Sequence, residues 1–309
     1  MDYGVVATNL LILFAMIGVG FVAGRAGVID KQGSGTLTNL LMKITLPATI
    51  IASMIREFDS DLIWDAAMIT IFGFAFFLLA AAIAWFLRKP FRVAEGNQGI
   101  WMTNVTFSNT GFMGFPVAIA LFGEEGLFLA VMMNISFNVL MYSMGVKMVC
   151  MDSEQNGSIH WRNIIVSNIN IALVIGLILF LGQIPVPTPV VTILEYLGDM
   201  TTPISMLLIG LSLSRGKVRD LFRGKDAFTA VLLRLFGMPL LAWVILSLLP
   251  FPSESLVPSV ALIIVAMPAP SAGLILTEQY QGNTELASKI IFLSSLLSLI
   301  SIPVMLMLL

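Results

Sequence analysis

The chain has 309 residues, of which 58% are hydrophobic and only 11% are charged, and its mean hydropathy is +0.97. Soluble domains carry roughly 25% charged residues, so this composition excludes an ordinary soluble protein and predicts a polytopic membrane protein. The net charge of −2 argues against a nucleic-acid partner, and the single cysteine, Cys150, excludes a disulfide framework and a thiolate metal site.

A helix that crosses the lipid bilayer needs about 20 apolar residues. Taken in order with this length, the apolar runs predict an all-α protein with ten membrane-spanning helices. They cover residues 4–24, 37–55, 62–87, 99–121, 127–150, 164–181, 190–213, 227–248, 256–277 and 286–309.

The longest polar interruption, residues 151–163, falls at the midpoint of the chain. It is predicted to be a cytoplasmic linker between a first five-helix repeat, 1–150, and a second, 164–309. Because each repeat would have an odd number of spans, the second must be inverted relative to the first.

Orientation follows from the lysine and arginine residues, which are enriched in cytoplasmic loops. Loops after the odd-numbered spans carry most of them, whereas loops after the even-numbered spans carry only Arg56. The odd loops are therefore predicted to be cytoplasmic and both termini to lie outside the cytoplasm, in a multi-pass protein of the cell (inner) membrane. The basic residues of the odd loops are Arg25, Lys31, Arg88, Lys89, Arg92, Lys147, Arg162, Arg215, Lys217, Arg219, Arg223 and Lys225.

Short patterns recur between the two halves at offsets close to half the chain length. Lys-Ile-Thr-Leu-Pro at 43–47 corresponds to Asp-Met-Thr-Thr-Pro at 199–203, and Pro116 with Glu124 corresponds to Pro270 with Glu278. Together these matches favour an inverted repeat, which is typical of secondary transporters.

Two spans contain residues that break helices. The fourth holds Thr-Phe-Ser-Asn-Thr-Gly-Phe-Met-Gly-Phe-Pro at 106–116, and the ninth holds Ala-Met-Pro-Ala-Pro-Ser-Ala-Gly at 266–273. Proline removes a backbone donor, and irregular backbone at membrane depth is tolerated only inside the protein or along a cavity. Broken spans in corresponding halves point to a transporter's binding site.

The new half-helices beyond these breaks would begin with unpaired N–H groups and a positive dipole end, which attract anions. Pro268 and Pro270 would in turn release the carbonyls of Ile264 and Ala266, which can face cations. The predicted substrate-binding residues are the polar and helix-breaking residues of both stretches and two asparagines one turn apart in the fifth span. They are Asn104, Ser108, Asn109, Thr110, Gly111, Pro116, Asn134, Asn138, Met267, Pro268, Pro270 and Ser271.

Charged residues within spans are functional candidates by default. Asp199 in the seventh span is a candidate for ion coupling, although it can also serve only to pair within the protein. Arg234 lies about two turns into the eighth span. Its side chain is expected either to reach the cytoplasmic surface or to contact a substrate anion.

Ser-Asn-Thr-Gly-Phe-Met-Gly-Phe-Pro at 108–116 resembles the fourth-span signature of the auxin efflux carrier family. Ala-Met-Pro at 266–268, Glu-Gln-Tyr at 278–280 and Ser-Ser-Leu-Leu-Ser at 294–298 resemble that family too. The short central loop is more similar to the bacterial branch, described as malate or malonate permeases.

This resemblance implies two inverted five-helix repeats in which broken helices 4 and 9 cross at the midplane. Helices 1, 2, 6 and 7 would form a scaffold, and helices 3–5 and 8–10 an elevator-like transport domain, in a possible homodimer. The family's substrates are organic anions. The distantly similar bile-acid sodium symporters carry an acidic residue just before the ninth-span break, where this chain has only the apolar residues 263–267. Sodium dependence is therefore expected to be weak or absent, with protonation of Asp199 as the alternative coupling.

An enzyme is not expected, since the chain has no His-Glu-x-x-His motif, no Cys/His cluster and no phosphate-binding loop. No cofactor or metal is expected either. A secondary active transporter of mono- or dicarboxylates is the favoured interpretation. An organic-anion channel or sensor is the alternative, but internal inversion favours alternating access and no loop is long enough for a sensor's output domain.

Overall fold

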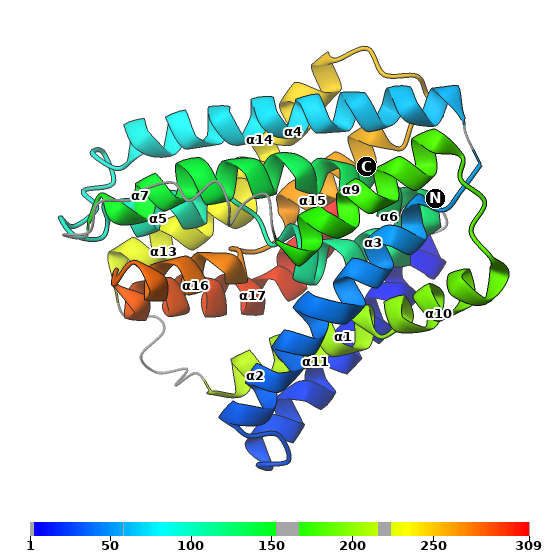
Figure 1. Ribbon diagram of the computed structural model, residues 1–309. Helices are drawn as coiled ribbons and strands as arrows, with labels where there is room; N and C mark the ends of the chain where they lie inside the picture. Colours follow the sequence, from blue (N-terminus) through cyan, green and yellow to red (C-terminus); the bar gives the residue numbers. More distant parts are fainter. Residues whose placement is uncertain (1–2, 58, 153–166, 216–223, 309) are drawn as a thin grey trace. The chain divides into compact units, whose positions relative to one another are not determined.

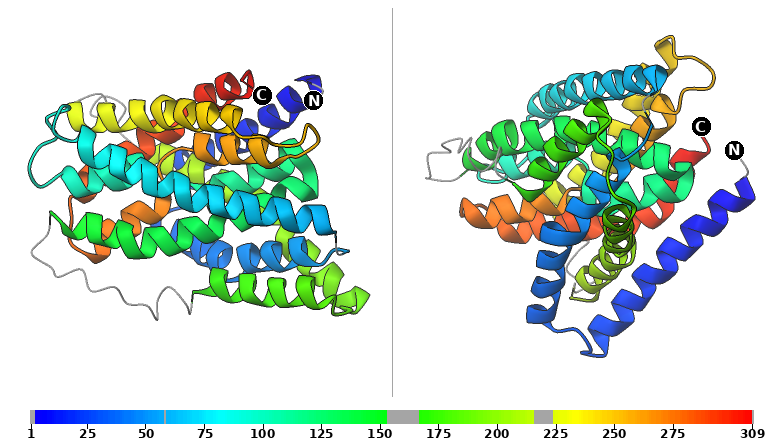
Figure 2. Two further views of the ribbon diagram at one scale, coloured as in Figure 1. Left: turned by 90° about the horizontal axis from the view of Figure 1, so that it is seen from above. Right: turned by 45° about the vertical axis from the view of Figure 1, so that its right-hand side comes forward.

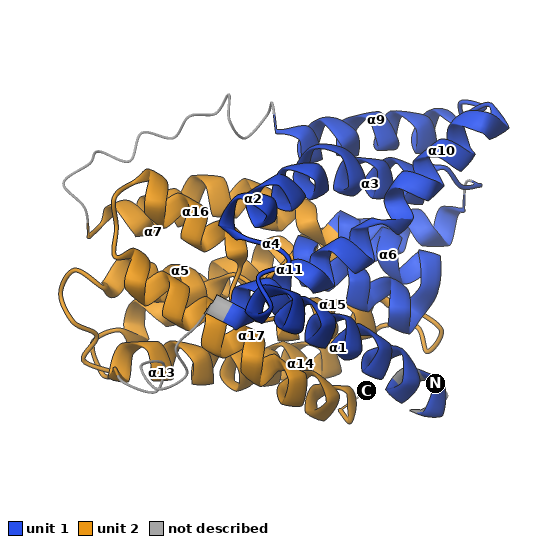
Figure 3. Ribbon diagram, turned by 90° about the horizontal axis from the view of Figure 1, so that it is seen from below, with its two compact units in different colours: residues 1–68, 111–132, 161–215 blue, residues 69–110, 133–160, 216–309 orange. Residues whose placement is uncertain are grey.

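The computed structural model describes residues 3–57, 59–152, 167–215 and 224–308, and every regular element in these ranges is a helix. The chain forms two compact units (Figure 3). Unit 1 comprises residues 1–68, 111–132 and 161–215, and unit 2 comprises residues 69–110, 133–160 and 216–309. Most of the predicted linker 151–163 and of the basic loop 215–225 lies outside the described residues.

Unit 1 is built from six complete helices, one π-helical turn and parts of two helices that continue into unit 2. The complete elements are α1 (Tyr3–Arg25), α2 (Lys31–Leu40), η1 (Leu41–Thr45), α3 (Leu46–Met54), α9 (Asn168–Gly182), α10 (Thr188–Asp199) and α11 (Thr201–Arg215). The shared helices are α4 (Ser60–Leu87) and α6 (Phe115–Leu140). A further π-helical turn, η2 (Thr110–Gly114), directly precedes α6, and all of it except Thr110 belongs to unit 1.

Helices α1 and α11 pack against each other along their length, and α1 is the long dark blue helix in the right-hand view of Figure 2. Their contact is made through glycines: a Cβ atom on Gly20 would collide with the main chain of Leu207, and one on Gly210 with the main chain of Ile17. Small residues allow two helices to approach closely enough for backbone contact, which is how helices associate where no hydrophobic effect separates protein from solvent. This pair therefore forms a tightly packed part of unit 1.

Unit 2 holds the remaining helices, which are drawn in Figure 1. They are α5 (Gln98–Thr106), η3 (Met141–Gly145), α7 (Val146–Cys150), α13 (Lys225–Leu232), η4 (Leu233–Gly237), α14 (Met238–Leu248), α15 (Val257–Ala266), α16 (Ser271–Gln279) and α17 (Thr284–Leu306). Helix α5 is buried along almost its whole length and contacts α7, α13, α16 and α17. It is the central element of this unit.

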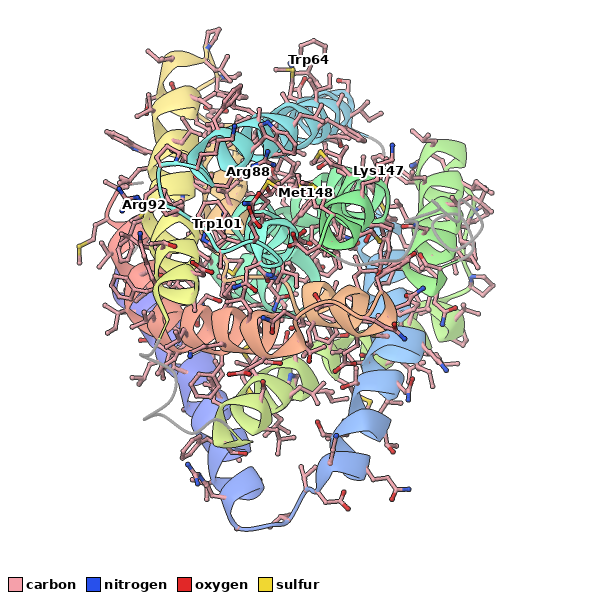
Figure 4. All side chains as sticks on the ribbon, turned by 90° about the vertical axis from the view of Figure 1, so that its left-hand side faces the viewer. Trp64, Arg88, Arg92, Trp101, Lys147 and Met148 are labelled. Carbon is pink, nitrogen blue, oxygen red and sulfur yellow. The ribbon has the colours of Figure 1, made fainter. Side chains whose placement is uncertain are left out.

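Side-chain contacts fix α5 against its neighbours. The Trp101 indole donates a hydrogen bond to the Thr229 hydroxyl at 3.1 Å. Figure 4 labels Trp101 together with Arg88, which directly follows α4, and Met148 from α7. The backbone of Gly99 lies directly against the Met148 carbonyl. Because α5 is held on several sides, the point at which it ends is well defined within unit 2.

Three of the four π-helical turns found in the described residues have a common cause. Pro47, Pro116 and Pro239 each stand two residues after the end of such a turn, η1, η2 and η4 respectively. A proline cannot donate to the carbonyl four residues before it, and its ring crowds that carbonyl. In each case this carbonyl belongs to the π-helical turn, so the wider turn relieves the conflict.

Seven described helical stretches are long and apolar enough to cross a membrane, or eight when the bent pair α15 and α16 is counted as one span. The two helices of that pair meet at 49°. One of the seven stretches, Gln98–Cys150, is 53 residues long and contains Gly123 with φ 67° and ψ −157°, which is not helical. The prediction of an all-α polytopic membrane protein is confirmed, whereas the count of ten spans stays a prediction.

Candidate functional site

Two extended segments interrupt helices inside unit 2, and we call residues 107–109 and 267–270 together the break site. Helix α5 ends at Phe107 (φ −96°, ψ 146°), and α15 ends at Met267 (φ −62°, ψ 150°). The Asn109 N–H donates to the Pro268 carbonyl at 2.8 Å. The two interruptions predicted from the sequence are therefore present and are joined by a main-chain hydrogen bond.

The prolines explain why α15 ends where it does. Pro268 and Pro270 have no N–H, so the carbonyls of Ile264 and Ala266 lose their helical donors. The Ile264 carbonyl was expected to be open to a cation, but it accepts a hydrogen bond from the Met267 N–H at 3.4 Å. That expectation is thus wrong for Ile264, because a tighter last turn of the helix supplies the missing donor.

Polar side chains at and beside the break site approach one another, and all of them except the half-buried Ser271 are buried. The Asn109 amide, 4% exposed, lies 3.4 Å from the hydroxyl of Ser271. The Thr110 hydroxyl donates to the Asn134 amide oxygen at 2.5 Å, and Asn138 is buried one turn further along α6. Residues from three separate stretches of the sequence therefore place amides and hydroxyls in one region of unit 2.

Several polar atoms here have no hydrogen-bond partner among the described residues. They are the Asn104 amide oxygen, the Thr106 hydroxyl and the Ser108 hydroxyl, all on fully buried side chains. The Asn104 amide nitrogen donates to the Ile100 carbonyl at 2.8 Å, and its oxygen faces Gly273 of α16. Buried polar groups without partners are costly, so these atoms mark a place where a bound molecule would restore hydrogen bonds.

The predicted site residues divide between the two units. Gly111, Pro116 and Asp199 belong to unit 1. The other ten lie in unit 2, namely Asn104, Ser108, Asn109, Thr110, Asn134, Asn138, Met267, Pro268, Pro270 and Ser271.

Arg234 was missed as a member of the break site. Its side chain is fully buried in η4, and its guanidinium donates to the carbonyls of Val105 and Thr106 at 3.0 Å each and to that of Val265. The expectation that this side chain reaches the cytoplasmic surface is therefore wrong, whereas contact with a substrate anion stays a prediction. One sequence feature could have pointed to this role: two predicted helix breaks leave main-chain carbonyls without donors, and a buried arginine can supply donors to several of them.

Unit 1 contains a cavity of about 140 Å³ next to the start of α6. Within it, the Thr49 hydroxyl lies 2.7 Å from the Thr201 hydroxyl and 3.1 Å from the Gly198 carbonyl. Threonine hydroxyls therefore link α3 to the junction of α10 and α11. The cavity is lined by Thr49, Ala52, Ser53, Phe115, Pro116, Ile119, Glu124, Leu127, Glu195, Gly198, Asp199, Thr201 and Thr202.

Comparison with known proteins places the chain among transporters. The model of the family described as "Membrane transport protein" matches residues 5–306, nearly the whole chain. The chain belongs to this family. The family is that of the auxin efflux carriers, so the resemblance inferred from the sequence is confirmed at this level. The likeness to the bacterial permease branch and to the bile-acid symporters stays a prediction.

Two relatives of this membrane transport protein come from archaea. An uncharacterized transporter of Methanothermobacter thermautotrophicus is 26% identical over 295 residues, covering 96% of this chain and 95% of that protein. The uncharacterized transporter MJ1031 of Methanocaldococcus jannaschii is 25% identical over 298 residues, covering 95% of each. The chain is thus a multi-pass membrane transporter and not an enzyme, as the sequence predicted.

Proposed function

We propose that this transporter carries small organic anions, specifically mono- or dicarboxylates, by secondary transport with alternating access. The observation that carries the proposal is the start of α16 at the break site. Its N-cap is Pro270, no side chain caps it in the described chain, and the Asn109 amide lies 3.4 Å from Ser271 in its first turn. An uncapped helix start attracts negative charge, and the adjacent amide adds further donors.

Unpartnered hydroxyls support a carboxylate as the group that is bound. The hydroxyls of Thr106 and Ser108 are buried without partners among the described residues, and each can donate to an oxygen atom. A carboxylate has two acceptor oxygens and no donor, so it complements these two hydroxyls. Moderate affinity is enough, because a transporter must release its substrate.

We further propose that the chain crosses the membrane ten times. The 53-residue stretch Gln98–Cys150 is more than twice the length that a span needs, and it turns at Gly123, so it supplies two crossings. The bent pair α15 and α16 supplies one more, and the short apolar helix α9 another. Added to the remaining long helices, these give the ten crossings that the sequence predicts.

Contacts between matching segments support the inverted repeat. Within unit 1, Thr49 beside the first Thr-x-Pro pattern bonds to Thr201 in the second. Within unit 2, Asn109 in the first break bonds to Pro268 in the second. Corresponding parts of two repeats meet in this way about a pseudo-two-fold axis. We propose that helices 1, 2, 6 and 7 form the scaffold and that helices 3–5 and 8–10 move in an elevator-like manner.

Coupling to protons through Asp199 is proposed in place of coupling to sodium. Asp199 lines the cavity of unit 1 together with Glu124 and Glu195, and an acidic residue within a membrane-spanning segment is a candidate for carrying protons. The proposal includes a cell-membrane location with both termini outside the cytoplasm, and a homodimer.

The experiment that tests the proposed function uses the purified protein in liposomes. Uptake of a panel of radiolabelled mono- and dicarboxylates should saturate, and unlabelled anion inside the liposomes should accelerate it by exchange. A parallel thermal-unfolding screen should find a stabilising anion, since a ligand at about 100 times its Kd adds about 2.7 kcal/mol. Flux that never saturates would indicate a channel, and the absence of any effect by any anion would refute the proposed substrate class.

A further inference from the structure

The buried guanidinium of Arg234 joins the ends of two half-helices. Arg234 lies in η4, which contacts both α5 and α15. One terminal nitrogen donates to the carbonyls of Val105 and Thr106 at the end of α5, and the other donates to the carbonyl of Val265 at the end of α15. A single side chain therefore binds the C-terminal ends of the two helices that are interrupted at the break site.

The two α5 carbonyls are those that lose their donors when the helix breaks. In an unbroken helix the Asn109 N–H would donate to the Val105 carbonyl and the Thr110 N–H to the Thr106 carbonyl. Here the Asn109 N–H donates to the Pro268 carbonyl at 2.8 Å, and the Thr110 N–H donates to the carbonyl two residues before it at 2.9 Å. Without Arg234, both α5 carbonyls would lack a donor among the described residues.

The same exchange occurs at α15. The Ala269 N–H, which would donate to the Val265 carbonyl in a continuous helix, donates instead to the Ser294 hydroxyl at 3.1 Å. The Val265 carbonyl then accepts from Arg234. All three carbonyls held by the guanidinium are thus products of the two breaks.

The charges match as well. A helix C-terminus carries about half of a negative elementary charge, so two ends together offset about one positive charge. In transporters with broken helices, freed carbonyls and half-helix C-terminal ends coordinate the coupling cation. Arg234, with 0% of its side chain exposed, already places a cation on those groups.

We propose that Arg234 is a resident cation of the break site: its guanidinium holds the position on the two half-helix ends that a coupling sodium ion would otherwise take. The inference rests on the proposed function and extends it, since it assigns the positive charge at the break site to the protein itself. A second positive ion on the same carbonyls would be repelled and would find its ligands occupied, so the break site works without sodium.

The test separates the charge of Arg234 from its hydrogen bonds by comparing two variants in thermal unfolding. Arg234→Lys keeps the charge and Arg234→Gln keeps amide donors without it. We expect the Lys variant to unfold at a higher temperature than the Gln variant, and both to unfold below wild type. A Gln variant as stable as the Lys variant would show that hydrogen bonding alone matters and would overturn the proposal.

Chemical rescue provides the second measurement. Arg234→Ala should lose stability, and millimolar guanidinium chloride should restore part of the loss, whereas choline chloride of equal ionic strength should not. Arg88→Ala is the matched control, because the Arg88 guanidinium lies 3.3 Å from the centre of the Trp85 ring and not on the broken helix ends, so guanidinium should not rescue it. If Arg234→Ala is as stable as wild type, or if guanidinium rescues both variants equally, the proposal is wrong.

Wild type should unfold at the same temperature in sodium chloride and in choline chloride. A sodium-dependent increase in wild type that Arg234→Ala lacks would show that sodium binds beside the arginine, and it would overturn the proposal. These measurements need no substrate. Their failure would leave anion transport standing, and failure to find a transported anion would leave the assignment of Arg234 intact.

Discussion

Replacing Asn109 by Ala tests whether the break site binds the substrate. The change removes the side-chain amide, which lies 3.4 Å from the Ser271 hydroxyl. It leaves the hydrogen bond from the Asn109 N–H to the Pro268 carbonyl in place, because that bond is made by the main chain. The break site should keep its backbone geometry, so any loss of binding can be assigned to the amide.

The expected magnitude follows from the hydrogen bonds of this amide. Its contact with Ser271 is long, so breaking it costs little stability, and the amide has a second N–H to offer. A hydrogen bond to a charged group contributes about 1.5–3 kcal/mol. Since about 1.4 kcal/mol corresponds to a tenfold change in Kd, Asn109→Ala should weaken anion binding by roughly 10- to 100-fold with little change in the unfolding temperature.

The assay is a titration of the stabilising anion, followed by thermal shift or calorimetry. Asn9→Ala is the matched control, because the Asn9 amide donates to the Ala120 carbonyl at 2.5 Å within unit 1. It should lower stability and leave the Kd unchanged. Asn109→Asp should prevent binding, because it adds a negative charge beside the anion. Wild-type affinity in Asn109→Ala would refute the reasoning and move the anion site elsewhere.

Three further predictions concern packing, topology and pH. Gly20→Ala should destabilise the protein by roughly 1–3 kcal/mol through overpacking against α11. Gly18→Ala should not, because its Cβ would meet nothing within 4 Å. Equal unfolding temperatures for the two variants would contradict the close packing of α1 on α11 at Gly20. Arg92→Cys in a Cys150→Ser background should react with an impermeant thiol reagent only after cells are opened, and reaction in intact cells would reverse the topology. Burial raises the pKa of the Asp152 carboxyl, against the opposing effects of two N–H donors and Arg88. The folded state therefore binds the carboxyl proton of Asp152 more tightly than the unfolded state does. The stability that this protonation provides is lost as the pH rises through the pKa of Asp152 in the folded state. Asp152→Asn should flatten that part of the profile of unfolding temperature against pH, and an unchanged profile would mean that Asp152 does not contribute.

Much of the helical structure could be predicted because it depends on local composition. Apolar runs of membrane length locate the long helices. The prolines at 268 and 270 locate the end of α15, because each lacks the N–H that would bond to the carbonyl four residues earlier. The same argument placed Pro116 next to an irregular turn, although the π-helical form of that turn was not foreseen.

The partners at the break site could not be read from the sequence in the same way. Arg234 is distant in sequence from both Val105 and Val265, and its partners are main-chain atoms that every residue possesses. No residue pattern marks such a contact. The Thr49–Thr201 bond was equally unforeseen, although both residues lie beside the repeated pattern. Side-chain identity shows what a group can bond to, and only the fold shows which carbonyl lacks its donor.

The way in which the break site is held together has a consequence for altering what the transporter recognises. The frame is made by a bond between two backbones and by one arginine on three carbonyls. The hydroxyls of Ser108 and Ser271 contribute nothing to that frame. A combinatorial library restricted to these two positions would therefore vary the side chains that face a ligand, while the hydrogen bonds that hold the break site together stay in place. Growth selection on different carbon sources would then show which pairs of side chains recognise which compounds.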